Sequence, residues 1–283
     1  MELIHVITDT LNVSLVTQQF HKIWKTAKVR PFPKDTNSSA LDQLRPISAT
    51  DITMSLSERK INPGFRIEET APSCFHQSDQ FAYKKDCGTE TALLYNHHFW
   101  MRWLDGHSNF VRVLSFDFSK AFDSVSYGIV TDKLKKVPDI NPYIVNWVID
   151  FLKGRQQRVW VGKVMAPFLA VSRGVPQGTV VGPVLLIIMV NDTSPTSQVT
   201  LITKYADDIM CSIPVGPSDS ASEEVENIKV WAEENLMKLT PSKTKELVIK
   251  ERTTLPLPKP IVTIKRVLYL KFLGVTFQDI PTN

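Results

Sequence analysis

Three aspartates in two short motifs have the type and spacing needed for catalytic chemistry. Asp117 lies about ninety residues before the adjacent pair Asp207 and Asp208. Each motif follows an apolar, strand-like segment, where a charge is costly without a partner. Carboxylate oxygens are preferred ligands of Mg²⁺, and two such ions stabilise the attacking and leaving oxygens of an in-line displacement. The pattern favours a two-metal nucleotidyl-transfer site, although each aspartate alone would also fit a helix N-cap or a hairpin turn.

A loop rich in glycine and proline lies between the two motifs. It runs from Arg173 to Pro183 and contains three glycines and two prolines around the single glutamine Gln177. Glycine allows the backbone to approach a ligand closely, and the helix start that follows offers unpaired N–H groups to a phosphate or a base. Gln177 is therefore a candidate contact for a template or a nucleotide, with a structural turn as the alternative.

Periodicity and turn residues predict the elements that must position these motifs. Alternation over residues 111–118 predicts a strand that leads to Asp117, and Asn141-Pro142 predicts a capped helix that ends at Gly154. Interspersed strands and helices of this kind predict an α+β architecture in which a small antiparallel sheet carries the site. Further helices are expected at the start of 1–35, ahead of an extended segment, at 89–103, after Gly182-Pro183 and after a Ser220/Glu223 capping box. Hairpins are expected at 158–171 and 199–213, and strands at 246–249 and 265–275. No defined element is expected in 36–75.

Composition is that of a folded chain with a mild positive charge. The 283 residues are 43% hydrophobic and carry a formal charge of +4. Two runs contain cations without acids, and such runs form either solvated faces or phosphate contacts. These runs consist of Lys22, Lys25, Lys28, Arg30 and Lys34, and of Lys153, Arg155, Arg158 and Lys163.

Several features indicate a soluble protein of a reducing compartment. The three cysteines, Cys74, Cys87 and Cys211, show no C-x-x-C spacing, so neither a disulfide framework nor a zinc site is indicated. The N-terminus lacks the order of a signal peptide, and the longest apolar run, 184–190, is too short to span a bilayer. We expect an intracellular protein of the nucleus and/or the cytoplasm, not secreted and without a membrane partner.

The motifs taken together resemble the reverse transcriptases, and among these the non-LTR retrotransposon branch (long interspersed elements, jockey-like). The resemblance covers almost the whole chain. It rests on Trp24-Lys25-Thr26-Ala27-Lys28-Val29, Leu44-Arg45-Pro46-Ile47-Ser48, Gln80-Phe81-Ala82-Tyr83-Lys84, Asp117 with Phe122, Gly174-Val175-Pro176-Gln177-Gly178, the Tyr205-Ala206-Asp207-Asp208 (YADD) box, Leu239-Thr240-Pro241-Ser242-Lys243-Thr244 and Lys271-Phe272-Leu273-Gly274-Val275.

The resemblance implies an RNA-directed DNA polymerase that transfers nucleotides from dNTPs to the 3′-hydroxyl of a DNA primer on an RNA template. Asp117 and Asp207 would hold two Mg²⁺ ions, with Mn²⁺ as a substitute, and Asp208 and the Phe118 carbonyl would be further ligands. Lys243 would protonate the leaving pyrophosphate.

The resemblance also implies the nucleotide contacts and the primer grip. Phe122 would be a steric gate against a 2′-hydroxyl, or else a core phenylalanine at the end of a strand. Gln177 would contact the template or the nucleotide, and Arg45 and Lys84 would neutralise the triphosphate. The primer end would be supported by Phe272, Leu273 and Gly274.

The implied architecture is a right-hand polymerase fold made of fingers (1–104), a palm with the catalytic motifs (105–250) and a primer-grip region (251–283). Thumb and endonuclease regions are expected to be absent from this chain. Two motifs depart from the family: Ala82-Tyr83-Lys84 stands where Gly-Phe-Arg is usual, so the bidentate guanidinium is lost, and Thr240 stands where asparagine is usual.

Two other functions remain open from the sequence. One is a catalytically inactive nucleic-acid-binding remnant of a truncated element, against which the intact carboxylates argue. The other is an RNA-dependent RNA polymerase with the same palm architecture, against which Phe122 argues, because such an enzyme must accommodate a 2′-hydroxyl.

Overall fold

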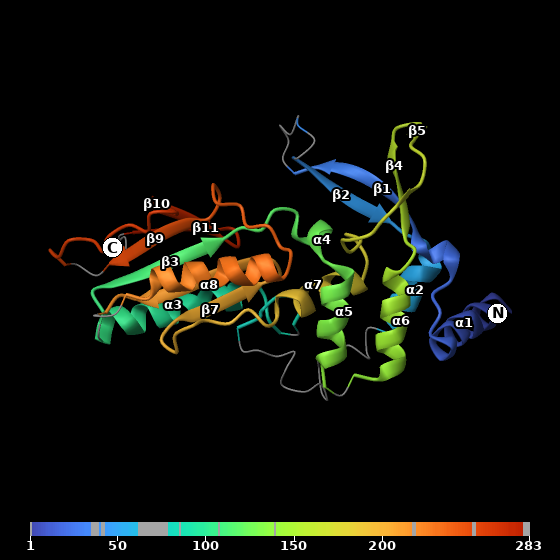
Figure 1. The fold of residues 1–283 in the computed structure, drawn as a ribbon, viewed down its shortest axis with the longest axis horizontal. Coiled ribbons are helices and arrows are strands. Elements are labelled where there is room, and N and C mark those ends of the chain that lie inside the picture. Colours follow the sequence, from blue (N-terminus) through green and yellow to red (C-terminus); the bar gives the residue numbers. More distant parts are fainter. Residues whose placement is uncertain are drawn as a thin grey trace. The chain divides into compact units, whose positions relative to one another are not determined.

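The computed structural model describes residues 2–34, 40, 43–61, 79–84, 86–106, 108–138, 140–216, 219–250 and 253–279. The chain forms two compact units, each built from two separate stretches (Figure 1). Unit 1 contains Met1–Phe75 and Phe122–Met189, and unit 2 contains His76–Ala121 and Val190–Asn283. Because these units interleave along the sequence, they do not follow the consecutive ranges 1–104, 105–250 and 251–283, whose assignment to fingers, palm and primer grip stays a prediction.

Unit 1 contains a mixed sheet of five strands in the order β2-β1-β4-β5, with β6 also paired to β4. β1 pairs antiparallel with β2 and parallel with β4. The predicted hairpin at 158–171 is confirmed, and its turn lies at Gly162, whose positive φ of 58° suits glycine. The strands are β1 (Thr26–Pro33), β2 (Leu44–Ala49), β4 (Gln156–Val161), β5 (Val164–Met165) and β6 (Leu169–Ala170).

Helices pack around an aromatic core in unit 1. Asn141 caps α6 through its side chain, which accepts a hydrogen bond from the Tyr143 N–H at 2.9 Å, so the predicted helix start is confirmed. The fully buried Trp147 and Phe151 of α6 pack against Phe20. The helices of unit 1 are α1 (Glu2–Thr17), the 3₁₀ turn η1 (Lys22–Lys25), α2 (Ile52–Ile61), α5 (Tyr127–Lys136), α6 (Pro142–Leu152) and α7 (Val181–Val190), whose last residue belongs to unit 2. The short helix α4 (Ala121–Ser124) has its first residue in unit 2 and the others in unit 1.

Unit 2 is built on a five-stranded sheet in the order β10-β9-β3-β8-β7. All its pairs are antiparallel except β10 with β9, which confirms the expected antiparallel palm sheet for four of the five strands. The strands are β3 (Phe110–Phe116), β7 (Leu201–Tyr205), β8 (Asp208–Pro214), β9 (Lys245–Lys250) and β10 (Lys265–Val267).

Two helices and a separate hairpin complete unit 2. Trp100 of α3 (Thr89–Gly106) shares a core with Val111 and Val113 of β3 and with Leu270 and Phe272 of β11 (Tyr269–Phe272), which pairs with β12 (Val275–Gln278). Alternation along β3 buries its other face as well, which explains why both faces read as apolar.

The predicted helix after Ser220 is confirmed as α8 (Ala221–Glu234), but the predicted capping box is wrong. Ser220 makes no side-chain cap hydrogen bond, and the Asp219 carboxylate instead accepts a hydrogen bond from the Ala221 N–H at 3.3 Å. In the part of the chain that the structure describes, no helix combines the length and the apolar character needed to cross a bilayer.

A buried carboxyl group, Glu58 of α2, tethers the start of α7 in unit 1. Its Oε2 accepts a hydrogen bond from the Val180 N–H at 3.0 Å, and its side chain is fully buried. Burial raises the pKa of Glu58 to about 7, although the Val180 N–H and the positive charge of Arg155 oppose this shift. The folded chain therefore holds a proton on this group at pH values where the unfolded chain has released it.

We predict that the free energy of unfolding falls as pH rises from about 4.5 to about 7 because of Glu58. The fall has this sign because the folded state binds the proton more tightly, and it amounts to at most about 3 kcal/mol. Denaturant unfolding of the wild type and of Glu58→Gln at a series of pH values checks it, since the amide keeps an acceptor for the Val180 N–H but does not titrate. Parallel pH curves for the two proteins would contradict the prediction.

Candidate active site

The YADD motif forms a two-residue turn between β7 and β8. Tyr205 pairs with Asp208, so Ala206 and Asp207 make the turn, which confirms the predicted hairpin. Ala206 has a positive φ of 55° and is 8% exposed. Because the register pairs Phe116 of β3 with Ile209 of β8, Asp117 follows β3 at the same end of the sheet where Asp208 begins β8. The sheet therefore brings the three predicted carboxylates together.

Burial and like charge disfavour ionisation at this end of the sheet. Burial is the main cause that raises the pKa of Asp208 to about 6, and the negative charges of Asp207 and Asp117 raise it further. The pKa of Asp207 is raised as well, first by burial and then by Asp117. A cation bound among these carboxylates would remove their mutual repulsion.

A second segment, residues 238–240, fixes the backbone around Asp117. The Thr240 N–H donates to the Asp117 carbonyl and the Ser119 N–H donates to the Lys238 carbonyl, both at 2.8 Å. Neither bond uses the Phe118 carbonyl, the predicted metal ligand. The buried Phe118 side chain packs edge-on against Trp231, so this residue is anchored by its ring.

Lys243 lies beside the first predicted metal ligand. Its Nζ is 3.6 Å from Asp117 Oδ2, and the two side chains are 62% and 37% exposed. An ion pair this exposed contributes little to stability, but it puts a proton donor at the site, as the predicted acid role requires.

The carboxylates have the donor chemistry of a divalent-metal site. Asp117 Oδ2 is buried and accepts no hydrogen bond; its one oppositely charged neighbour among the described residues is the Lys243 ammonium at 3.6 Å, so a coordinated cation would satisfy this oxygen. Among the described residues, no group of three or more His, Cys, Asp or Glu side chains is arranged to enclose a metal ion. Magnesium is commonly held by one or two carboxylates together with substrate phosphates, which matches this open arrangement.

Unit 1 assembles three of the predicted nucleotide contacts. The Gln177 carbonyl accepts a hydrogen bond from the Ser48 N–H at 2.8 Å, which attaches the glycine-rich loop to β2, the strand that contains Arg45. The Phe122 carbonyl accepts a hydrogen bond from the Val175 N–H at 2.8 Å, so the predicted gate residue is tied to the same loop. Phe122 is half-buried and Arg45 is exposed.

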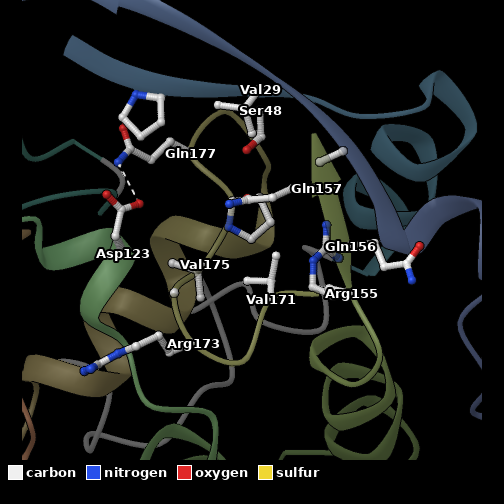
Figure 2. A pocket seen from close by; sticks show the side chains of 14 residues that line it. Val29, Ser48, Asp123, Arg155, Gln156, Gln157, Val171, Arg173, Val175 and Gln177 are labelled. Atoms are coloured by element: carbon white, nitrogen blue, oxygen red, sulfur yellow. Dashed lines mark hydrogen bonds between the residues drawn. The ribbon is translucent and has the colours of Figure 1, made fainter. Parts of the chain in front are cut away.

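Gln177 lines a cavity of about 310 Å³ within unit 1 (Figure 2). Its amide nitrogen lies 3.5 Å from the Asp123 carboxylate, the dashed line in Figure 2. Arg155, Arg173 and Gln157 also line this cavity, so a ligand here would meet both cations and amides. Asp123 was not foreseen; its position directly after Phe122 was the available signal.

Lys84 and the primer-grip residues lie in unit 2. The charge of Lys84 acts on the Asp79 carboxylate, whose pKa it helps to lower against the larger effect of burial. Phe272 is a core residue at 4% exposure, whereas Leu273 and Gly274 form the β11–β12 turn with positive φ values of 47° and 88°. Of the residues predicted to form the primer grip, the Phe272 side chain is therefore part of the core, whereas Gly274 of the turn is exposed.

Tyr83 is a site residue for which no role was predicted. The residue is 60% exposed, but partial desolvation raises the pKa of its hydroxyl, and the negative charge of Asp207 raises that pKa further. The signal was its place in the motif Ala82-Tyr83-Lys84.

Residues 32–277 match the family model described as reverse transcriptase (RNA-dependent DNA polymerase). The chain is 25% identical over 94% of its length to a probable RNA-directed DNA polymerase from transposon BS of Drosophila melanogaster, and 25% identical over 83% of its length to the RNA-directed DNA polymerase from mobile element jockey of the same species. It spans only 31% and 26% of these two relatives.

Solved structures of telomerase share the fold. The telomerase of Candida albicans, in complex with a fragment of telomeric RNA, matches 95% of this chain and 47% of its own with a TM-score of 0.58 at 13% identity. The apo telomerase of Candida tropicalis matches 97% of this chain and 52% of its own with a TM-score of 0.57 at 12% identity. The expected right-hand polymerase fold is confirmed, and the chain belongs to the reverse transcriptase (RNA-dependent DNA polymerase) family.

Proposed function

We propose that this chain is the reverse transcriptase domain of a jockey-like, non-LTR retrotransposon, and that it extends a DNA primer on an RNA template from dNTPs. The observation that carries the proposal is the meeting of Asp117, Asp207 and Asp208 at one end of the β3–β8 pair. Beyond the effect of burial, the charge of Asp117 helps to raise the pKa of Asp207, and the charges of Asp207 and Asp117 help to raise the pKa of Asp208. Chromosomal copying of such an element would require this domain to reach the nucleus.

The three carboxylates would bind the cations that neutralise the negative charge of the substrate phosphates. Asp117 and Asp207 would hold two Mg²⁺ ions, with Asp208 and the Phe118 carbonyl as further ligands. When bound, the ions would activate the primer 3′-hydroxyl and neutralise charge on the phosphates. Lys243, within 3.6 Å of Asp117, would give a proton to the leaving pyrophosphate.

Nucleotide selection would fall to unit 1. The Phe122 carbonyl accepts a hydrogen bond from the Val175 N–H, and Gln177 lies two residues further along the same loop. The backbone therefore holds Phe122 and Gln177 close to one another. The ring would exclude a 2′-hydroxyl and the amide would contact the template or the incoming base. Arg45, on the exposed surface of β2, would neutralise the triphosphate.

A second candidate, nucleic-acid binding without catalysis, is favoured by the exposed face of the unit 1 sheet. The Arg30 guanidinium lies 4.0 Å from the Trp160 ring centroid, and that of Arg158 lies 4.4 Å from the Phe168 ring centroid. The strands β1, β2 and β4 contain no acidic residue. Cations interleaved with aromatic rings are typical of single-strand binding surfaces.

We predict that the purified chain extends a DNA primer on an RNA template with Mg²⁺ and labelled dNTPs, and that Asp207→Asn lowers the rate by roughly a thousandfold. Loss of one ligand removes several kcal/mol of charge stabilisation in the transition state. Asp105→Asn, on the exposed surface of α3, is the matched control and should extend normally. If wild type and Asp207→Asn bind primer–template equally and neither extends it, the second candidate is the function.

We predict that Phe122→Val admits ribonucleotides. Removing the ring opens space for a 2′-hydroxyl, so the ratio of kcat/KM for dNTP to that for rNTP should fall by about tenfold or more. Phe151→Leu, in the core of unit 1, should lower stability and leave this ratio unchanged. An unchanged ratio in Phe122→Val would identify Phe122 as a packing residue only.

A further inference from the structure

We propose that Gln80 is a positioning residue that sets the direction of the Asp207 carboxylate by holding the backbone of Ala206. The proposal rests on the proposed function and adds a residue, remote in sequence from the catalytic box, on which metal binding depends. All the groups involved lie in unit 2.

The Gln80 side-chain oxygen accepts two backbone hydrogen bonds inside the protein. The Ala206 N–H donates to it at 3.3 Å and the Ala82 N–H at 3.0 Å. Gln80 is 3% exposed, so water does not compete for this oxygen. One side-chain atom thus joins the start of the catalytic turn to a segment 126 residues earlier in the chain.

Ala206 is the residue of the turn that most needs to be held. Its φ of 55° lies in the left-handed region, where a Cβ is unfavourable by roughly 1–2 kcal/mol. It is also nearly buried, so its N–H would lack a partner without Gln80. Because Asp207 is the next residue, any relaxation of Ala206 would turn the carboxylate away from Asp117 and Asp208.

Backbone hydrogen bonds to β7 hold Gln80 in place, so its side chain can in turn hold the 206–207 turn. The Phe81 N–H donates to the Lys204 carbonyl at 2.9 Å, and the Lys204 N–H donates to the Asp79 carbonyl at 2.6 Å, so residues 79–81 extend the sheet beside β7.

The Lys204 side chain further stabilises the pairing of residues 79–81 with β7. It is fully buried, and its Nζ lies 3.2 Å from Asp79 Oδ2 and donates to the carbonyls of Asn191 and Thr193 at 3.0 and 2.8 Å. A buried ammonium with this many partners cannot shift without losing them.

The side-chain oxygen of Gln80 is the atom that holds the Ala206 N–H. The Gln80 amide nitrogen is buried and makes no hydrogen bond in the described structure, so removing it costs no contact. Gln80→Met keeps the length and shape of the side chain and removes the acceptor, which makes it the informative variant.

Asn96 of α3 offers a matched control, because it is also a buried amide side chain and its hydrogen-bond partner Thr203 lies on β7, the strand that leads into the turn. It is fully buried, its oxygen accepts a hydrogen bond from the Thr203 hydroxyl at 3.0 Å, and its amide nitrogen donates to the Ala92 carbonyl at 2.8 Å. Asn96→Leu therefore removes a buried polar contact, in this case to Thr203 of β7, and leaves the hydrogen bond between Gln80 and Ala206 in place.

The experiment compares wild type, Gln80→Met, Asn96→Leu, Ala206→Gly and the double variant Gln80→Met/Ala206→Gly at a temperature where all are folded. Three measurements are made: hydrogen exchange of the residue-206 amide, affinity for Mn²⁺ by electron paramagnetic resonance, and kcat and KM for dNTP in primer extension. The first two do not depend on polymerase activity.

Gln80→Met should speed exchange of the residue-206 amide, weaken Mn²⁺ binding and lower kcat by about ten- to a hundredfold, because small misplacements of catalytic groups have effects of this size. KM for dNTP should change by less than about twofold, since Gln80 is buried and is not one of the proposed nucleotide contacts. Ala206→Gly should recover part of the loss when added to Gln80→Met, because glycine adopts positive φ without strain. Asn96→Leu should lower thermal stability and leave all three measurements at wild-type values.

Unchanged amide exchange and Mn²⁺ affinity in Gln80→Met would overturn the proposal, as would equal losses in Asn96→Leu. If the wild type fails to extend a primer, the proposed function fails, but the exchange and Mn²⁺ measurements still decide the role of Gln80.

Discussion

Repulsion among three carboxylates at one end of the unit 2 sheet is the constraint on which the rest of this structure depends. Burial and like charge both oppose ionisation of Asp207 and Asp208, so the folded chain gains nothing from this cluster by itself. The sheet must therefore be stable enough elsewhere to keep these residues together. It is: β3, between β8 and β9, is almost wholly buried, and the segment after it is pinned by residues 238–240.

The same strand contains a buried charge, that of Arg112, whose partners are supplied by the protein itself. Arg112, only five residues before Asp117, is 3% exposed and pairs with Glu246 and Asp219, while Arg266 donates twice more to Glu246. There the charges compensate one another within the protein. At the other end of β3 no described side chain compensates Asp117 beyond the exposed Lys243. This contrast along one strand supports the proposed cation site at Asp117.

Close backbone approach is the corresponding constraint in unit 1. Gly174 has a positive φ of 86°, and a Cβ there would lie 2.9 Å from the Asp123 backbone. The glycine-rich loop can therefore lie directly against the segment that contains Phe122 and Asp123, and Gln177 follows at a fixed distance along the chain. Glycine at this position was readable from the sequence as a turn, but the partner it approaches was not.

The helices and strands that the sequence predicts correctly are those whose signals lie within a few neighbouring residues. Helix α6 and the 199–213 hairpin were foreseen because Asn141, Gly154 and the alternating apolar residues act over a few positions. Strand β2 and helix α2 were missed because 36–75 is polar and aperiodic, and β2 is held by pairing with β1 and with Gln177. The capping box failed because Asp219, one residue earlier, supplied a competing acceptor.

The site itself divides in the same way. The carboxylates and Gln177 could be named from residue type and order, since metal chemistry and loop chemistry require those side chains. Gln80 and Asp79 could not be given roles, because their partners Ala206 and Lys204 lie more than a hundred residues away and no pattern links them. Catalytic groups are thus visible in a sequence through their chemistry, whereas the residues that aim them are ordinary polar side chains whose importance comes only from the contacts the fold creates.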